Sequence, residues 1–244
     1  MKNIEKISIL CPTRNRIQTT NGNFIYDLID SARSTADNPE CVEFVFYVDD
    51  DDVSSQSYFD SFEDPNIKVV CGPRIVLSEM WNKCYDNSSG DIVQQCGDDV
   101  RFRTQSWDTI VRDKFSEIDD RIAFVFGRDG YVELDRPKDF FGTHGFVHKN
   151  WVEVVGYFLP PHFSSDCSDE WLNDVAKMIG RHFYVEIYTE HLHPVAGKYV
   201  WDDTHKERLE RHNRDDVYAL YKTLSSERDD DARALLKFIE RSAS

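Results

Sequence analysis

Short apolar runs alternate with amphipathic stretches through the first half of the chain, and this rhythm constrains the fold most strongly. The strand-like runs are Ile7–Cys11, Val42–Val48, Ile67–Cys71, Asp91–Gln95 and Ile122–Phe126. Between them, apolar residues recur at helical spacing over Asn23–Ala36, Val76–Tyr85 and Trp107–Ile118. This alternation predicts an α/β fold with a mostly parallel central sheet, right-handed crossovers and flanking helices.

The rhythm stops after Gly127. Residues 127–170 are rich in glycine, proline, histidine and aromatic side chains, and they predict short elements only. A helix is expected at Trp171–Ile179 and a strand at Phe183–Tyr188, followed by two C-terminal helices around Lys206–Leu224 and Asp230–Ile239. We therefore expect a main domain over residues 1–200 and a helical extension over residues 201–244 that packs on it.

Charge and cysteine spacing narrow the class of protein. The chain has 29 Lys and Arg against 45 Asp and Glu, a net charge of −16, which excludes non-specific binding to a phosphate backbone as the main activity and suits a cation-binding protein. No run approaches the roughly 18 apolar residues of a membrane span, and the charged N-terminus does not predict a cleaved signal peptide. The six cysteines form no CxxC pair, so we expect reduced, mostly buried thiols in a cytoplasmic protein without a cysteine-based zinc site.

Charged and turn-forming residues follow four of the predicted strands. The four loops are Pro12-Thr13-Arg14-Asn15-Arg16, Asp49-Asp50-Asp51-Asp52, Gly72-Pro73-Arg74 and Gly97-Asp98-Asp99-Val100. In an open parallel sheet, ligands bind beyond the carboxyl ends of the strands. Two acidic and two basic loops at one edge predict a site for a metal ion together with a phosphorylated ligand.

These motifs resemble a family-2-like glycosyltransferase of the GT-A fold. The resemblance is carried, in order, by ILCPTRNR, FYVDDDD, GPRIVLSEMWNKCYDNSSGDIVQQCGDDVRF and GYFLPPHFSSDCSDEW, and it spans about residues 7–200. Gly97 stands where the first aspartate of the family's Asp-x-Asp signature often stands. The resemblance implies that residues 1–200 bind both the nucleotide-sugar donor and the acceptor.

The resemblance also implies a nucleotide site. Pro12, Thr13 and Arg14 would line the nucleotide, and Asp49 or Asp50 would contact the base or the ribose.

Further donor contacts are implied by the later motifs. Ser78 and Asn82, four residues apart on one helix face, would border the nucleotide, and Arg74 would approach it from the preceding loop. Asp98 would face the ribose or the metal ion.

The same resemblance implies the reacting groups. Asp99 would bind Mn²⁺ or Mg²⁺ on the diphosphate, and His193 would be an additional metal ligand, with His191 as the alternative. An inverting transferase needs a general base for the acceptor hydroxyl, and Asp169 is favoured over Glu170. Asp166 is the third candidate for the base.

The implied function is a metal-dependent, inverting transfer of a hexose or pentose from a nucleotide-diphosphate sugar, expected to be a UDP-sugar. The acceptor stays open among a glycan, a protein and a modified nucleobase. The last would need a basic groove, for which the candidates are Arg101, Arg103, Lys206, Arg208, Arg211 and Arg214. The loop Gly127–Gly145, which contains His144, is the expected acceptor-facing lid.

Two other functions compete with this one. A nucleotidyltransferase would use the same strand ends, but it needs a glycine-rich first loop, and CPTRNR contains no glycine. A catalytically inactive nucleotide- or sugar-binding relative is the second alternative. The leading hypothesis requires Arg14, Asp49 and Asp99 to converge on one crevice around a cation and a diphosphate.

Overall fold

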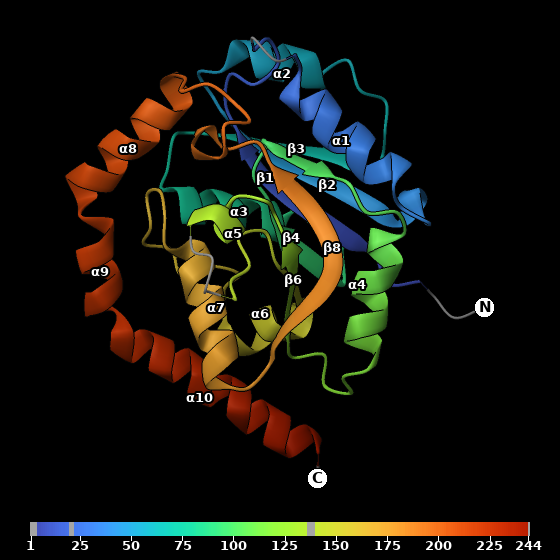
Figure 1. The fold of residues 1–244 in the computed structure, drawn as a ribbon, viewed down its shortest axis with the longest axis vertical. Helices are drawn as coiled ribbons and strands as arrows, with labels where there is room; N and C mark the ends of the chain where they lie inside the picture. Colours follow the sequence, from blue (N-terminus) through green and yellow to red (C-terminus); the bar gives the residue numbers. More distant parts are fainter. Residues whose placement is uncertain (1–3, 20–21, 136–139, 244) are drawn as a thin grey trace.

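The structure, a computed structural model, describes residues 4–19, 22–135 and 140–243. In these residues eight strands form one sheet with the spatial order β3-β2-β1-β4-β7-β6-β8-β5 (Figure 1). The strands are β1 (Ile7–Thr13), β2 (Val42–Asp49), β3 (Ile67–Gly72), β4 (Ile92–Gln95), β5 (Val100–Phe102), β6 (Phe124–Arg128), β7 (Phe146–His148) and β8 (His182–His191).

The sheet is mostly parallel, as expected, but it is mixed rather than purely parallel. β1 is parallel to both of its neighbours, β2 and β4, and β3 extends this block in parallel. Beyond it, β7 runs antiparallel between β4 and β6, β8 is parallel to β6, and β5 is antiparallel to β8. The sequence did not predict β5 and β7, because strands of three residues are too short to show an alternating pattern.

Helices cover both faces of the sheet. The described helices are α1 (Phe24–Ser34), α2 (Val53–Phe59), α3 (Leu77–Asp86), α4 (Trp107–Ser116), α5 (Val132–Asp135), α6 (Lys149–Val155), α7 (Ser168–Met178), α8 (Asp203–Asp215), α9 (Val217–Thr223) and α10 (Ser225–Ser242). Neighbouring strand residues point to opposite faces, so β1 contributes Ile9 to the core under α1 and α4, and Leu10 to the core under α3, α6 and α7. Every residue of β2 is buried, as expected for a central parallel strand.

The C-terminal helices differ from the prediction at one point. The single helix expected over Lys206–Leu224 is two helices, α8 and α9, because Asp216 between them has a left-handed backbone with φ of 42°. The helix expected over Asp230–Ile239 lies within α10, which packs against α6 and α7. Figure 1 shows α8, α9 and α10 following one another around one side of the molecule. The division into a domain over 1–200 and an extension over 201–244 stays a prediction.

All six cysteines are free thiols, and four of them are buried. The helices in the described part of the chain include none with the length and apolarity needed to cross a bilayer.

Candidate active site

The loops after β1 and β4 meet at the carboxyl edge of the sheet, because these two strands are parallel neighbours. Thr13 Oγ1 donates a hydrogen bond of 2.8 Å to Asp98 Oδ2, and Arg16 Nε lies 3.3 Å from Asp98 Oδ1. Both carboxylate oxygens of Asp98 are therefore held by the first loop. Pro12 is half-buried within β1, opposite Tyr47 of β2.

The loop after β2 contributes Asp49, which is only 3% exposed. Arg14 Nη1 donates to Asp49 Oδ2 at 2.9 Å, and Arg74 Nη1 lies 3.7 Å from the same oxygen. The other oxygen, Asp49 Oδ1, is buried without a hydrogen-bond partner. Asp50 is exposed, and Asp52 caps α2 by accepting a hydrogen bond from the backbone N–H of Ser55.

Arg14 and Asp99 line two adjoining cavities rather than a single crevice. Arg14 lines a cavity of about 410 Å³ beside Asp202 and Thr204. Asp99 lines a second cavity of about 250 Å³, to which Thr204 and Arg16 also contribute. Asn15, between the two arginines, has a left-handed backbone with φ of 55°, and the side chains of Arg14 and Arg16 enter different cavities.

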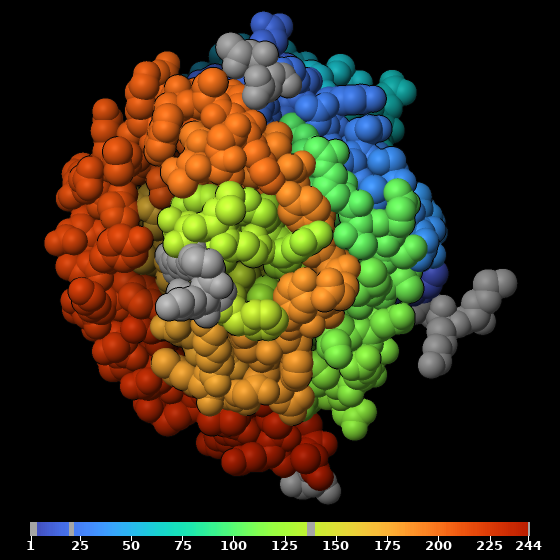
Figure 2. Space-filling view, in the orientation of Figure 1, coloured from blue at the N-terminus to red at the C-terminus, as the bar shows by residue number. Residues whose placement is uncertain are grey.

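The smaller cavity collects most of the predicted reacting groups. Its lining includes Asp99, Asp166, Asp169, Glu170, His191 and His193. Arg16 and Arg208 add positive charge, and Tyr131, Phe141 and Thr143 add a wall from the loop expected to be a lid. In Figure 2 the yellow-green segment that contains α5 lies against the orange segment that follows β8. Residues 136–139 of the expected lid lie outside the described residues, and the lid role stays a prediction.

The pKa values of the neighbouring residues Asp98 and Asp99 are shifted in opposite directions. Burial, together with the charge of Asp99, raises the pKa of Asp98 to about 6 despite the nearby Arg16. Burial also acts to raise the pKa of Asp99, but His191 and Arg16 outweigh it and hold that pKa well below its ordinary value. Asp99 is therefore the carboxylate of the pair that stays ionised at the lower pH, which suits a cation ligand.

His191, the last residue of β8, and His193, two residues further on, have different surroundings. His193 Nδ1 accepts a hydrogen bond of 3.3 Å from the backbone N–H of Val195, so the proton of its neutral ring is on Nε2. Burial and the charge of His191 lower the pKa of His193 to about 4. His193 thus presents an N–H donor to the cavity, which fits a phosphate oxygen better than a metal ion.

His191 lies closer to Asp99 and is the stronger candidate for a metal-associated histidine. His191 Nε2 is 3.3 Å from Asp99 Oδ2. Burial acts to lower the pKa of His191, but Asp99 and Asp129 raise it to about 9.

The three candidates for the general base lie in the same cavity wall. Asp166 is fully engaged, because Oδ1 accepts from Arg208 Nε at 3.0 Å and Oδ2 lies 2.6 Å from His212 Nδ1. Asp169 Oδ1 accepts from the backbone N–H of Glu170 at 3.1 Å, at the first turn of α7. Burial, followed by the charge of Glu170, raises the pKa of Asp169 well above its ordinary value. A half-buried carboxyl with a raised pKa is a stronger proton acceptor than a carboxyl whose pKa is ordinary.

Three predicted donor residues are engaged elsewhere. Ser78 Oγ accepts from the backbone N–H of Phe163, and Asn82 donates to the carbonyl of Leu159, so both side chains hold the loop between α6 and α7. Arg74 pairs with Glu207 of α8 as well as approaching Asp49.

Five of the six residues proposed for a basic groove pair with carboxylates, and the sixth, Arg211, lines a cavity of about 660 Å³ with Arg74 and Arg214, in which Glu79, Glu207 and Glu210 also take part. Arg101 pairs with Asp27, Arg103 with Glu190, and Arg208 with Asp166. Lys206 and Arg214 pair with aspartates of their own helix, Asp203 and Asp215.

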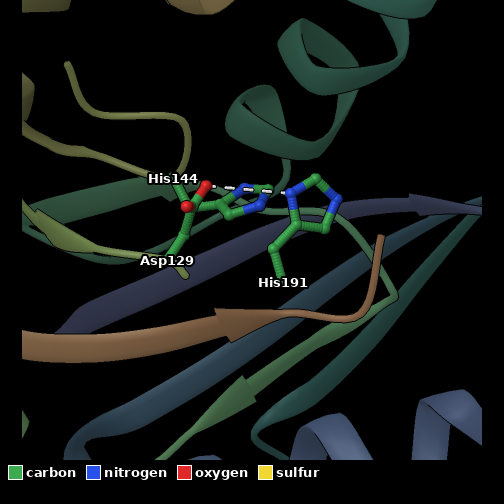
Figure 3. Close-up of side chains that lie close together, drawn as sticks. All are labelled: Asp129, His144 and His191. Carbon is green, nitrogen blue, oxygen red and sulfur yellow. Dashed lines mark ion pairs between the residues drawn. The ribbon is translucent and has the colours of Figure 1, made fainter. Parts of the chain in front are cut away.

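Two residues near Asp99 were not predicted as site residues. Asp129 follows β6 as Asp98 follows β4. Listing the residues after the fifth predicted strand, as was done for the first four, would therefore have identified Asp129. His144 precedes β7, a strand that the sequence did not predict. Figure 3 shows the side chains of Asp129, His144 and His191 pointing toward one another.

Gly97 has a steric reason to be glycine. A Cβ atom at this position would lie 2.7 Å from Asp99 Oδ1 and 3.5 Å from His144 Cε1. The Asp99 carboxylate therefore occupies the space that a side chain at position 97 would need.

We expect Gly97→Asp, which would restore the Asp-x-Asp pattern, to displace Asp99; if the chain binds a nucleotide with Mn²⁺, as its sequence predicts, the Mn²⁺-dependent part of that binding should weaken by about tenfold or more. Gly97→Ala should act in the same direction. The measurement is the shift in melting temperature with UDP, with and without Mn²⁺. Tighter Mn²⁺-dependent binding in Gly97→Asp would contradict this account.

Comparison with known proteins supports the fold. No family model matches the sequence, and the search of curated proteins found no match. The mannosyltransferase PcManGT from Pyrobaculum calidifontis, solved with GDP-Man and Mn²⁺, superposes with a TM-score of 0.61 at 15% identity, covering 99% of this chain and 74% of that one. S. aureus TarS 1–349, solved with UDP-GlcNAc, gives a TM-score of 0.54 at 13% identity, covering 85% of this chain and 72% of that one. The chain has the GT-A-like fold that the sequence motifs predict.

Proposed function

We propose that the chain is a glycosyltransferase that moves a sugar from a nucleotide-diphosphate sugar to an acceptor hydroxyl. One observation carries the proposal: a single cavity is lined by the ionised Asp99 and by the pair Asp169 and Glu170. These are the two kinds of carboxylate that the reaction needs, one for a cation on the leaving group and one for the acceptor proton. The solved structures that share the fold include complexes with GDP-Man and UDP-GlcNAc, which supports a nucleotide-sugar donor.

The nucleotide is proposed to bind at the ends of β1 and β2. The buried, unpartnered Asp49 Oδ1 can only accept a hydrogen bond while ionised, so it suits an N–H group of the base. Arg14 holds Asp49 in place and lines the larger cavity beside it. We propose UDP as the nucleotide, since uracil offers such a group at N3.

The diphosphate is proposed to reach the smaller cavity, where Arg16, His193 and Arg208 present N–H donors. Asp99 and the diphosphate would hold Mn²⁺ or Mg²⁺, which when bound supplies Lewis acidity to the leaving group. The fit of a divalent cation at this position is supported by Asp99, a buried carboxylate whose pKa is held low.

Asp169 is proposed as the general base, with Glu170 as its neighbour and second candidate. Its raised pKa suits the removal of a proton from an acceptor hydroxyl that enters past Tyr131 and Phe141. Attack from that side, opposite the diphosphate, would invert the anomeric carbon.

The acceptor is left as a glycan, a protein or a modified nucleobase. A cytoplasmic location stays a prediction that rests on the free cysteines.

Nucleotide binding is the direct test of the donor site. A ligand at 100 times its Kd stabilises the folded state by about 2.7 kcal/mol, or about 5–10 °C in a protein of this size. We expect UDP with Mn²⁺ to raise the melting temperature by this amount, and GDP to serve as the comparison nucleotide. Asp49→Asn should reduce the shift, whereas Asp119→Asn, at an exposed position after α4, should not.

No shift with millimolar UDP or GDP plus Mn²⁺ would reject the proposal. Hydrolysis of a UDP-sugar in water would separate an active transferase from a protein that only binds the nucleotide. The anomeric configuration of the transferred sugar, read by NMR, would test inversion.

A further inference from the structure

Three buried side chains converge beside His191's position in the lining of the smaller cavity, and His191 is one of them. Asp129 follows β6, His144 precedes β7 and His191 ends β8, and they are 3%, 9% and 9% exposed. One potential ligand atom from each lies within 4.8 Å of the other two. Figure 3 shows the three side chains from three different segments of the chain turned toward a common point.

Each of the three is held in place through its other polar atom. Asp129 Oδ1 accepts hydrogen bonds of 2.8 Å from the backbone N–H groups of Tyr131 and Val132. His191 Nε2 lies 3.3 Å from Asp99 Oδ2. The His144 ring is hydrogen-bonded to the Gln95 backbone, and because Nε2 has no partner, this bond is made by Nδ1.

Each of the three side chains also has one buried polar atom that no hydrogen bond satisfies. Asp129 Oδ2, His144 Nε2 and His191 Nδ1 are all buried and have no hydrogen-bond partner. Asp129 Oδ2 and His191 Nδ1 are 3.7 Å apart, an ion pair beyond hydrogen-bonding distance. An unsatisfied buried polar atom destabilises a fold, and here three of them meet at one place.

We propose that Asp129, His144 and His191 form a transition-metal site, separate from the cation that Asp99 would hold on the donor. One ion would satisfy all three atoms, and hydrogen bonds to a backbone carbonyl and a carboxylate are the usual way in which ligating histidines are oriented. Two imidazoles and one carboxylate select Zn²⁺, Co²⁺, Mn²⁺ or Fe²⁺ over Mg²⁺.

Asp99 is not a ligand of this proposed site. It contacts the opposite nitrogen of His191 and is not among the group of atoms within 4.8 Å of one another. The proposed ion would fix His191 and, through it, the orientation of Asp99. His191 lines the cavity, which gives an ion a path to the site. Ligand atoms on a tetrahedral ion are about 3.4 Å apart, so atoms that now lie within 4.8 Å of one another would have to move closer by at most about 1.4 Å.

The test is metal binding by the full chain in the absence of nucleotide, after treatment with EDTA. We expect one equivalent of Co²⁺ to bind with a change in its visible absorption spectrum, Zn²⁺ to displace it, and Mg²⁺ to have no effect. His144→Gln and Asp129→Asn should abolish this binding. His162→Gln, a matched substitution at an exposed histidine, should leave it unchanged. Asp99→Asn should retain the site with about 10–100-fold weaker affinity.

Three outcomes would overturn the proposal. The first is that neither Co²⁺ nor Zn²⁺ binds the chain in the absence of nucleotide. A protonated His191 would then bridge Asp99 and Asp129 in place of an ion. Asp99→Asn could abolish binding while His144→Gln preserves it, which would assign the ion to Asp99. X-ray absorption of the Zn²⁺-loaded wild type could show a shell of oxygen atoms only. This last measurement needs no variant, so a variant that fails to fold leaves the proposal testable, and none of the three depends on glycosyl transfer.

Discussion

Replacing Asp169 with asparagine should lower the rate of sugar transfer by about 10²–10⁴-fold, the usual contribution of a general base. Nucleotide binding should be retained, because asparagine has nearly the same shape as aspartate and Asp169 belongs to the first turn of α7 rather than to the loops proposed to hold the nucleotide. The measurement is kcat for transfer beside the UDP-induced shift in melting temperature. Asp119→Asn, exposed after α4, is the matched control for both.

The pH dependence of the wild type should identify the same group. Transfer requires the ionised form, and burial and Glu170 raise the pKa of Asp169. The acid limb of the pH–rate profile should therefore lie well above the ordinary aspartate pKa of about 3.9, and it should be absent in Asp169→Asn. If Glu170→Gln removes activity and Asp169→Asn does not, Glu170 is the base.

Stability should change in the opposite direction to activity. A carboxyl whose pKa is higher in the folded than in the unfolded chain reduces stability as the pH rises through the folded pKa. Asp169 is such a group, so Asp169→Asn should melt at a higher temperature than the wild type at pH 7–8. The gain should disappear below about pH 4, where the wild-type carboxyl is protonated in both states.

Replacing Arg16 with glutamine should destabilise the fold by about 3–5 kcal/mol, the usual cost of removing one partner from a buried ion pair. The Arg16 side chain is 4% exposed, with Nε 3.3 Å from Asp98 Oδ1 and Nη1 2.5 Å from Asp202 Oδ2. Its guanidinium also lies 5.2 Å from the ring centre of Phe24. At about 2–4 °C per kcal/mol, the melting temperature should fall by about 6–20 °C.

The loss in Arg16→Gln should depend on pH in a defined direction. Burial raises the pKa of Asp98 to about 6 even with Arg16 present. Without the arginine the buried carboxylate lacks its main counter-charge, so the difference from the wild type should grow as the pH rises from 5 to 8. Arg33→Gln is the control, because its pair with Asp64 is about a quarter exposed on both sides and should cost under about 1 kcal/mol. Equal losses in the two variants would contradict the role of Arg16.

The sequence predicted those parts of the fold whose pattern is long enough to show a period. β1, β2 and β3 and helices α1, α3 and α4 lie within a few residues of their predicted ranges, because four or more apolar residues repeat in each. The three-residue strands β5 and β7 have no such repeat. The break at Asp216 depends on a single left-handed residue within an otherwise helical pattern.

The candidate site was predicted where a strand end supplied the residue. Asp49, Asp98 and Asp99 follow predicted strands, and their neighbours in space could be anticipated from parallel pairing. The sequence could not predict that Arg16, rather than Arg14, lines the smaller cavity, because this depends on the left-handed backbone of Asn15. His144 could not be placed because its strand was not recognised.

The contact between Arg16 and Asp202 joins positions 186 residues apart. At a synthesis rate of about 5–20 residues per second, the arginine leaves the ribosome about 10–40 s before its partner. During that interval β1 to β4 can already pair, but the cavity wall that follows β8 does not yet exist. We therefore expect the smaller cavity to be completed late in synthesis, because a nascent chain that stops before Asp202 contains all eight strands but lacks Thr204, His205 and Arg208 of the cavity lining.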